Sequence, residues 1–100
     1  MREIAISLAS PADCREIERA IDQVIDESGL NTTLRASLRK FPGCIHWHLK
    51  RGVESGTLEL TFWPRERRAW FTIQDGRKAA WIDEQLKVLD TAIRLQIGDI

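Results

Sequence analysis

Two histidines and one glutamate are the residues of this sequence whose types and spacing best suit chemistry. His46 and His48 stand two apart in the run IHWHLK, and Glu59 follows in the run GTLELTFW. Side chains two apart in a strand point to the same face, so both imidazoles would share one side of a sheet, with Glu59 opposite His48. Such a group could transfer protons, pair as charges or ligate zinc, which accepts nitrogen and carboxylate donors.

Cys44 lies two residues before His46 and would add a thiol to the same face. This leaves open a metal- or thiol-dependent enzyme, with a metal held by the group or with Cys44 as nucleophile and a histidine as base. A His-x-His pair has no diagnostic spacing to further ligands, and no nucleophile elbow or glycine-rich phosphate loop follows a strand. We therefore predict no catalytic residue, no metal and no cofactor, and interpret His48 and Glu59 as a cross-strand charge pair.

Three segments between Cys44 and Gln74 alternate apolar and polar residues, as half-buried strands do. Short reversals separate them, so we expect a three-stranded antiparallel meander. One of its faces is uniformly apolar and must be covered by helices. A register that keeps the core residues on one side pairs Leu49 with Leu58, Trp47 with Leu60, and Leu60 with Phe71.

The opposite face of this predicted sheet is polar and aromatic. Its tryptophans could form a stacking or hydrophobic platform beside the histidines, which would mark a ligand pocket or a partner surface. Two alternatives stay open: an ordinary solvated face with cross-strand pairs, and a surface covered by a second copy of the chain. The predicted ligand- or partner-binding residues are His46, His48, Glu59, Thr61, Trp63 and Trp70.

Helices are expected on either side of the meander. Residues 11–28 carry apolar residues at intervals of three and four and are followed by Gly29, which suits a helix end. A shorter helix is predicted over residues 33–40 after a cap in Asn31-Thr32-Thr33. The last helix is predicted over about residues 77–96, with Asp75 as its cap.

The resulting order is α-α-β-β-β-α, which is an α+β two-layer sandwich. Residues 2–8 alternate weakly and form either an extra N-terminal edge strand or a frayed lead-in. One hundred residues make one domain, residues 1–100. A second apolar stripe on the last helix would meet the first helix or form a subunit interface, and consists of Trp81, Val88, Ala92 and Leu95.

Basic residues are concentrated in the middle of the chain, although 15 Lys and Arg balance 15 Asp and Glu overall. Clusters at the hairpin tips could follow a phosphate backbone, so a nucleic-acid-binding module is the alternative function. Zero net charge favours ordinary solubilising charges instead. The residues of this alternative are Arg65, Arg67, Arg68, Arg77 and Lys78.

A helix, three antiparallel strands and a helix, over about residues 11–96, resemble the double-stranded-RNA-binding domain. The run Gly76-Arg77-Lys78-Ala79-Ala80 is similar to the basic helix start of that family. The resemblance is one of fold order, which does not by itself carry the RNA-binding function of that family. This chain departs from the family pattern by its second short helix, by having few basic residues further along the last helix, and by lacking the Gly-Pro-His strand-entry motif.

The leading hypothesis is a small bacterial-type binding or interaction domain, non-enzymatic, that forms a homodimer or binds a protein partner. No apolar run is long enough to cross a bilayer and no signal-peptide pattern is present, so we expect a cytoplasmic protein that does not contact membranes. Two cysteines in such a protein are expected as free thiols.

Overall fold

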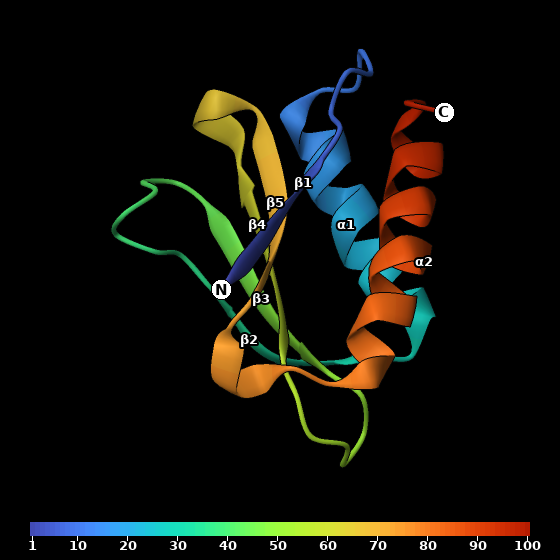
Figure 1. Cartoon of the computed structure of the whole chain (residues 1–100). Coiled ribbons are helices and arrows are strands. Elements are labelled where there is room, and N and C mark those ends of the chain that lie inside the picture. The colour runs from blue at the N-terminus through green and yellow to red at the C-terminus, as the bar shows by residue number, and fades with distance from the viewer.

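The computed structural model describes residues 1–100 and contains two helices and a five-stranded sheet (Figure 1). This confirms the predicted α+β class, with an antiparallel sheet covered by helices. In chain order the elements are β1 (Arg2–Ile6), α1 (Cys14–Ser28), β2 (Asn31–Ala36), β3 (Ile45–Lys50), β4 (Leu58–Trp63), the 3₁₀ turn η1 (Pro64–Glu66), β5 (Arg68–Ile73), the 3₁₀ turn η2 (Asp75–Arg77) and α2 (Ala80–Ile97).

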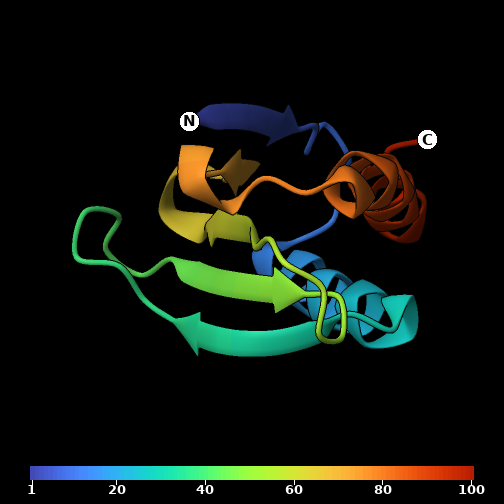
Figure 2. The same cartoon turned by 60° about the horizontal axis from the view of Figure 1, so that its bottom comes forward.

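The sheet is antiparallel throughout and its strands lie in the order β1-β5-β4-β3-β2. Strands β3, β4 and β5 form the predicted meander at its centre (Figure 2). Strand β1 pairs with β5 at one edge, which confirms the N-terminal edge strand. The predicted register is also confirmed: the structure pairs Leu49 with Leu58, Trp47 with Leu60, and Leu60 with Phe71.

The short helix predicted over residues 33–40 is wrong. Residues 31–36 form strand β2 instead, which pairs with the free edge of β3 from Asn31 opposite Lys50 to Ala36 opposite His46. An eight-residue helix is marginal by itself, whereas a strand here satisfies the backbone groups of β3. The β-branched Thr32 and Thr33 also suit a strand, which lies at the sheet edge.

Helix α1 ends at Gly29, as predicted, and helix α2 ends at Gly98; the two glycines have φ values of 79° and 81°. Helix α1 begins after Asp13, whose Oδ1 accepts from the Glu16 backbone N–H at 2.9 Å. Helix α2 begins three residues later than predicted, because Asp75 and the two residues after it form the separate turn η2.

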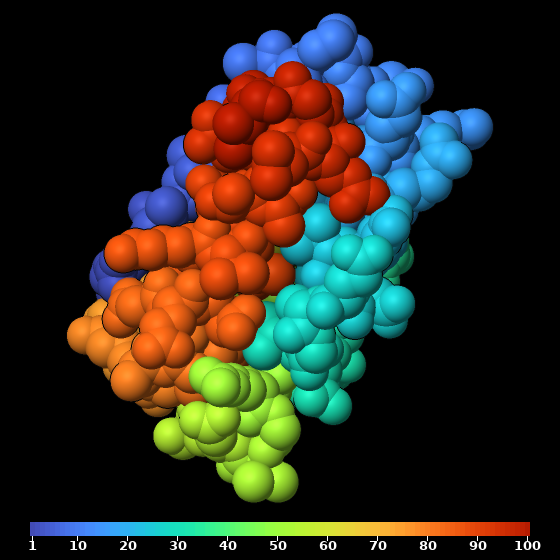
Figure 3. Space-filling view, turned by 90° about the vertical axis from the view of Figure 1, so that its right-hand side faces the viewer, coloured from blue at the N-terminus to red at the C-terminus, as the bar shows by residue number.

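Helices α1 and α2 lie side by side on one face of the sheet (Figures 1 and 3). Between helices and sheet is one continuous core of 22 buried apolar residues, which includes Trp47, Phe62 and Phe71 at 0% exposure. The buried indole of Trp47 donates to Asp22 Oδ1 at 3.0 Å, so this polar group is satisfied. Neither helix has the length and apolar character needed to span a membrane.

Candidate metal centre

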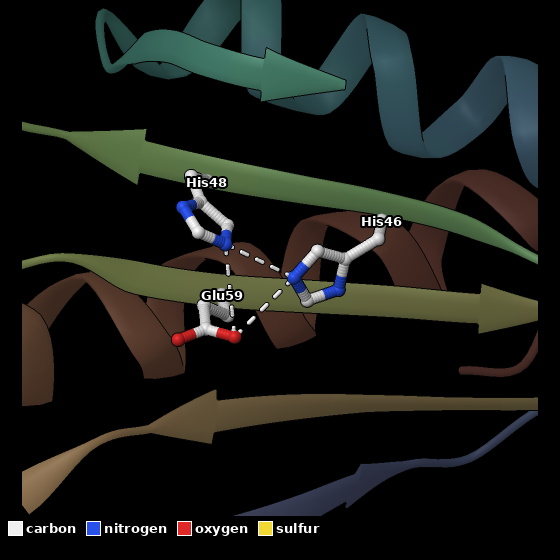
Figure 4. A group of neighbouring side chains, drawn as sticks. All are labelled: His46, His48 and Glu59. Carbon is white, nitrogen blue, oxygen red and sulfur yellow. Dashed lines mark hydrogen bonds and ion pairs between the residues drawn. The ribbon is translucent and has the colours of Figure 1, made fainter. Parts of the chain in front are cut away.

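The sheet face turned away from the helices carries the predicted site residues. Because the register places His48 opposite Glu59 and His46 opposite Thr61, the two histidines of β3 face the same part of β4. Glu59 is in turn opposite Thr72 of β5. Figure 4 shows both imidazoles and the carboxylate pointing toward one another above this central part of the sheet.

The ligating atoms of these three side chains form a compact triangle. His46 Nε2 lies 3.1 Å from His48 Nε2. Glu59 Oε1 lies 3.3 Å from His46 Nε2 and 3.8 Å from His48 Nε2. Three Lewis bases from two strands therefore converge on one point.

The cluster is largely shielded from water. The side chains of His46 and Glu59 are 6% and 9% exposed, and that of His48 is 23% exposed. Burial lowers the pKa of His46 below its ordinary value; the Glu59 carboxylate opposes this shift and the neighbouring His48 adds to it. His46 is therefore held as the neutral imidazole, the form that ligates metals.

Thr61 fixes the second nitrogen of His46. Its Oγ1 lies 2.8 Å from His46 Nδ1, and Thr61 itself is 1% exposed. A neutral imidazole that donates from Nδ1 to this hydroxyl leaves Nε2 with a lone pair aimed at Glu59 Oε1. Metal-bound histidines usually donate their other ring nitrogen to such a partner, which fixes the ring and its tautomer.

One cation of the chain borders the cluster. Arg77 Nη1, on turn η2, lies 3.7 Å from Glu59 Oε2, the carboxylate oxygen that does not face the histidines. This separation is too long for a hydrogen bond, and the Arg77 side chain is 48% exposed. Its guanidinium donors thus remain available on the solvent side of the cluster.

The tryptophans of the predicted platform lie beside the cluster but under another aromatic ring. The connection between β2 and β3 curls out on the side away from the helices (Figures 1 and 2). Its Phe41 packs edge-on against Trp63 and Trp70, with ring centroids at 5.1 and 4.9 Å. Trp63 Nε1 donates to the Pro42 carbonyl at 3.0 Å, and Trp70 is only 6% exposed. The sequence pattern did not assign Phe41 to this face, because Phe41-Pro42-Gly43 is typical of a turn.

The two thiols lie outside the cluster. Cys44 is 1% exposed, and its sulfur accepts from the Leu38 backbone N–H at 3.3 Å. Cys14 Sγ lies 3.7 Å from the Pro64 carbonyl oxygen. Both cysteines are free, as expected. The group that can hold a metal therefore consists of His46, His48 and Glu59 alone.

The residues of the nucleic-acid alternative are divided among different local contacts. Arg67 Nη2 donates to the Ser10 carbonyl at 2.6 Å, and the Arg68 guanidinium lies over the Trp70 ring at 5.1 Å. Arg65 and Lys78 are exposed. RNA binding by these residues stays a prediction, although the chain has five strands where the resemblance relied on three.

Comparisons of the chain with protein-family models, with curated proteins and with solved structures find no match. The function of the chain is therefore inferred from the geometry of the cluster itself.

Proposed function

We propose that this chain is a metal-binding domain that holds one divalent transition-metal ion, Zn²⁺ first, on His46 Nε2, His48 Nε2 and Glu59 Oε1. The observation that carries the proposal is the triangle of these atoms, with sides of 3.1, 3.3 and 3.8 Å. The proposal agrees with the hypothesis of a binding domain drawn from the sequence. It specifies that the polar face of the sheet binds a metal ion.

The dimensions of the triangle suit such an ion. A circle through three points with these separations has a radius of about 2.0 Å, and Zn–N and Zn–O bonds are about 2.0–2.2 Å long. An ion close to the plane of the three atoms would thus lie at bonding distance from all of them. Two histidines and a carboxylate are also a ligand set that zinc and non-haem iron use in proteins.

In one tautomer of His46 a cation also resolves an electrostatic conflict in the cluster. When Nδ1 of His46 donates to Thr61, the lone pair of Nε2 faces an oxygen of the Glu59 carboxylate at 3.3 Å. Two acceptors at this distance repel each other, and in a shielded site water cannot weaken that repulsion. The single Nε2–H that a neutral His48 can offer satisfies one of these two acceptors, whereas a metal ion satisfies all three donor atoms.

Calorimetric titration of untagged, chelator-treated protein with Zn²⁺ tests the proposal. We expect one equivalent to bind, and at free Zn²⁺ about a hundredfold above Kd the stability should rise by about 2.7 kcal/mol, or Tm by roughly 10–20 °C. H48A and E59Q should weaken binding at least a hundredfold. T61V should weaken it roughly tenfold to a hundredfold, because Thr61 orients the His46 ring.

E54Q is the matched control, since Glu54 is an exposed carboxylate of the β3–β4 hairpin that pairs only with Arg51. Its affinity for Zn²⁺ should equal that of the wild type. Thermal melts of the apo variants separate a lost ligand from a lost fold. Sub-stoichiometric binding by the wild type, or wild-type affinity in folded H48A, would show that the triangle is not a metal site.

We also propose that the chain forms a homodimer, and that the contact is the exposed part of the second α2 stripe. Trp81 of that stripe is buried and donates to the Ser55 carbonyl at 2.8 Å, but Val88 and Leu95 are 57% and 59% exposed. Both line a groove of about 330 Å³ between α1 and α2, which a second copy of the same ridge would fill. Light scattering at low and high salt measures the solution mass, and a monomer at both would contradict the proposal.

The free thiols of Cys14 and Cys44 support a reducing compartment, so the cytoplasm remains the proposed location.

A further inference from the structure

We infer that the proposed metal ion takes a small oxyanion, a carboxylate or phosphate group, as its external ligand, and that Arg77 binds this anion. The inference rests on the proposed function and specifies the kind of ligand that the site accepts. It is carried by the position of Arg77, a guanidinium that borders the cluster without a hydrogen bond to it.

The cluster supplies too few ligands to complete the coordination sphere of a metal ion. His46, His48 and Glu59 provide three donor atoms, whereas divalent ions bind at least four, and zinc binds four or five. Sites with three protein ligands keep a position for water or substrate. That position must lie on the side away from the sheet, where His48 is partly exposed.

The backbone of Arg77, whose guanidinium lies 3.7 Å from Glu59 Oε2, is held by hydrogen bonds. The Thr57 backbone N–H donates to the Arg77 carbonyl at 3.0 Å, and the Arg77 N–H donates to the Gln74 carbonyl at 3.0 Å. Gly56 packs so closely on the same turn that an added Cβ would lie 3.1 Å from the Arg77 carbonyl oxygen. These contacts hold turn η2 in place, while the guanidinium at the end of the side chain makes no hydrogen bond and is paired with Glu59 alone, at 3.7 Å.

The charges of the site call for an anion once the metal is present. Glu59 carries one negative charge, and the Arg77 guanidinium lies 3.7 Å from it. A divalent ion adds two positive charges and would be bound by the Glu59 carboxylate. The guanidinium of Arg77 and the metal ion would then lie on either side of this single negative charge and repel each other. An oxyanion that bonds to the metal with one oxygen and accepts from Arg77 with another would remove this repulsion, and guanidinium binds such groups through paired N–H donors.

The test uses protein loaded with Co²⁺, whose visible spectrum responds to a change of ligand at the open position, and sodium acetate as the probe. We expect acetate to change the spectrum of the wild type with saturable binding. R77Q should raise the acetate Kd at least tenfold while binding Co²⁺ at least as tightly as the wild type, since it removes a positive charge beside Glu59. R51Q is the control, because Arg51 is a half-exposed arginine that pairs with Glu54 on the β3–β4 hairpin; its acetate Kd should not change.

Failure of the inference is distinguishable from failure of the metal site. If Co²⁺ binds but acetate leaves the spectrum unchanged, or R77Q binds acetate as the wild type does, the anion is not held by Arg77 and the inference is overturned. If Co²⁺ does not bind the wild type, the metal proposal fails and the inference fails with it. Equal loss of acetate affinity in R77Q and R51Q would indicate only a general charge effect and would also overturn it.

Discussion

Gly56 should be the least replaceable glycine of the chain, because two features of its environment exclude a side chain. It lies in the β3–β4 hairpin against the connection from β5 to α2. A Cβ added there would lie 2.6 Å from Ala79 Cβ, a distance that real atoms do not tolerate. The backbone of Gly56 also has a φ of 99°, which side-chain-bearing residues rarely adopt.

The cost of G56A results from these two features. A non-glycine residue in this backbone region costs on the order of 1–3 kcal/mol. Forcing an extra methyl group into a packed contact costs roughly another 1–3 kcal/mol, because the Ala79 end of the connection must move. We therefore expect a loss of about 2–6 kcal/mol in unfolding free energy, which lowers Tm by roughly 10–50 °C in a domain of this size.

Gly76 provides the matched control on the other side of the same contact. Its φ is not positive and an added Cβ would meet nothing within 4 Å. G76A should therefore be neutral or stabilise by up to about 1 kcal/mol, through lower entropy of the unfolded chain. Thermal and urea unfolding of both variants measure the difference. A G56A variant that melts within about 3 °C of the wild type, or at a higher temperature than G76A, would refute the reasoning and with it the fixed position of turn η2.

Two further predictions concern helix α2. The Arg94 guanidinium, which donates to Asp99 at 2.9 Å, is the main reason that the pKa of Asp99 lies below its ordinary value of 3.8, with Ser7 and the Ala9 backbone contributing. A carboxylate whose pKa is lower in the folded than in the unfolded chain stabilises the fold at pH values above its ordinary pKa, and this stabilisation is lost as pH falls toward the folded-state pKa. D99N should therefore have a lower unfolding free energy than the wild type at pH 7, and the difference between the two should shrink below about pH 4. A difference in urea unfolding that stays constant from pH 7 to 3 would contradict this. V88K should convert the proposed dimer to a folded monomer in light scattering, while D83K, a charge change at an exposed position on another side of the same helix, should leave the dimer intact; a dimer that persists in V88K would place the interface elsewhere.

The three central strands were predictable because apolar and polar residues alternate along each of them with a period of two. Leu58, Leu60 and Phe62 alternate with polar residues, and a slip of one residue would turn them away from the helix side that holds Trp47 and Leu49. Among registers that differ by two residues, tight and symmetric reversals select the one observed. Strand β2, in contrast, could not be predicted from its own sequence pattern. Its Leu34 and the nearby Leu38 lie four apart, as in a helix, and the pairing with β3 that decides the matter comes from outside the segment. The sequence period of an edge strand with both faces exposed carries little information, since no core selects it.

The sequence alone does not favour a metal site, and the register of the sheet explains why. Zinc motifs are recognised when ligands recur at fixed spacings along one loop or helix, whereas here the third ligand comes from a neighbouring strand, 11 residues beyond His48. The register alone gives the direct pair His48–Glu59 and leaves His46 diagonal to Glu59. A diagonal pair meets only if its side chains are long and aimed inward. The hydrogen bond between Thr61 and His46 Nδ1 orients the imidazole ring so that Nε2 points toward Glu59. A threonine directly opposite one histidine of a strand His-x-His pair, with a carboxylate opposite the other, is therefore a pattern that predicts a converging site once the register is known.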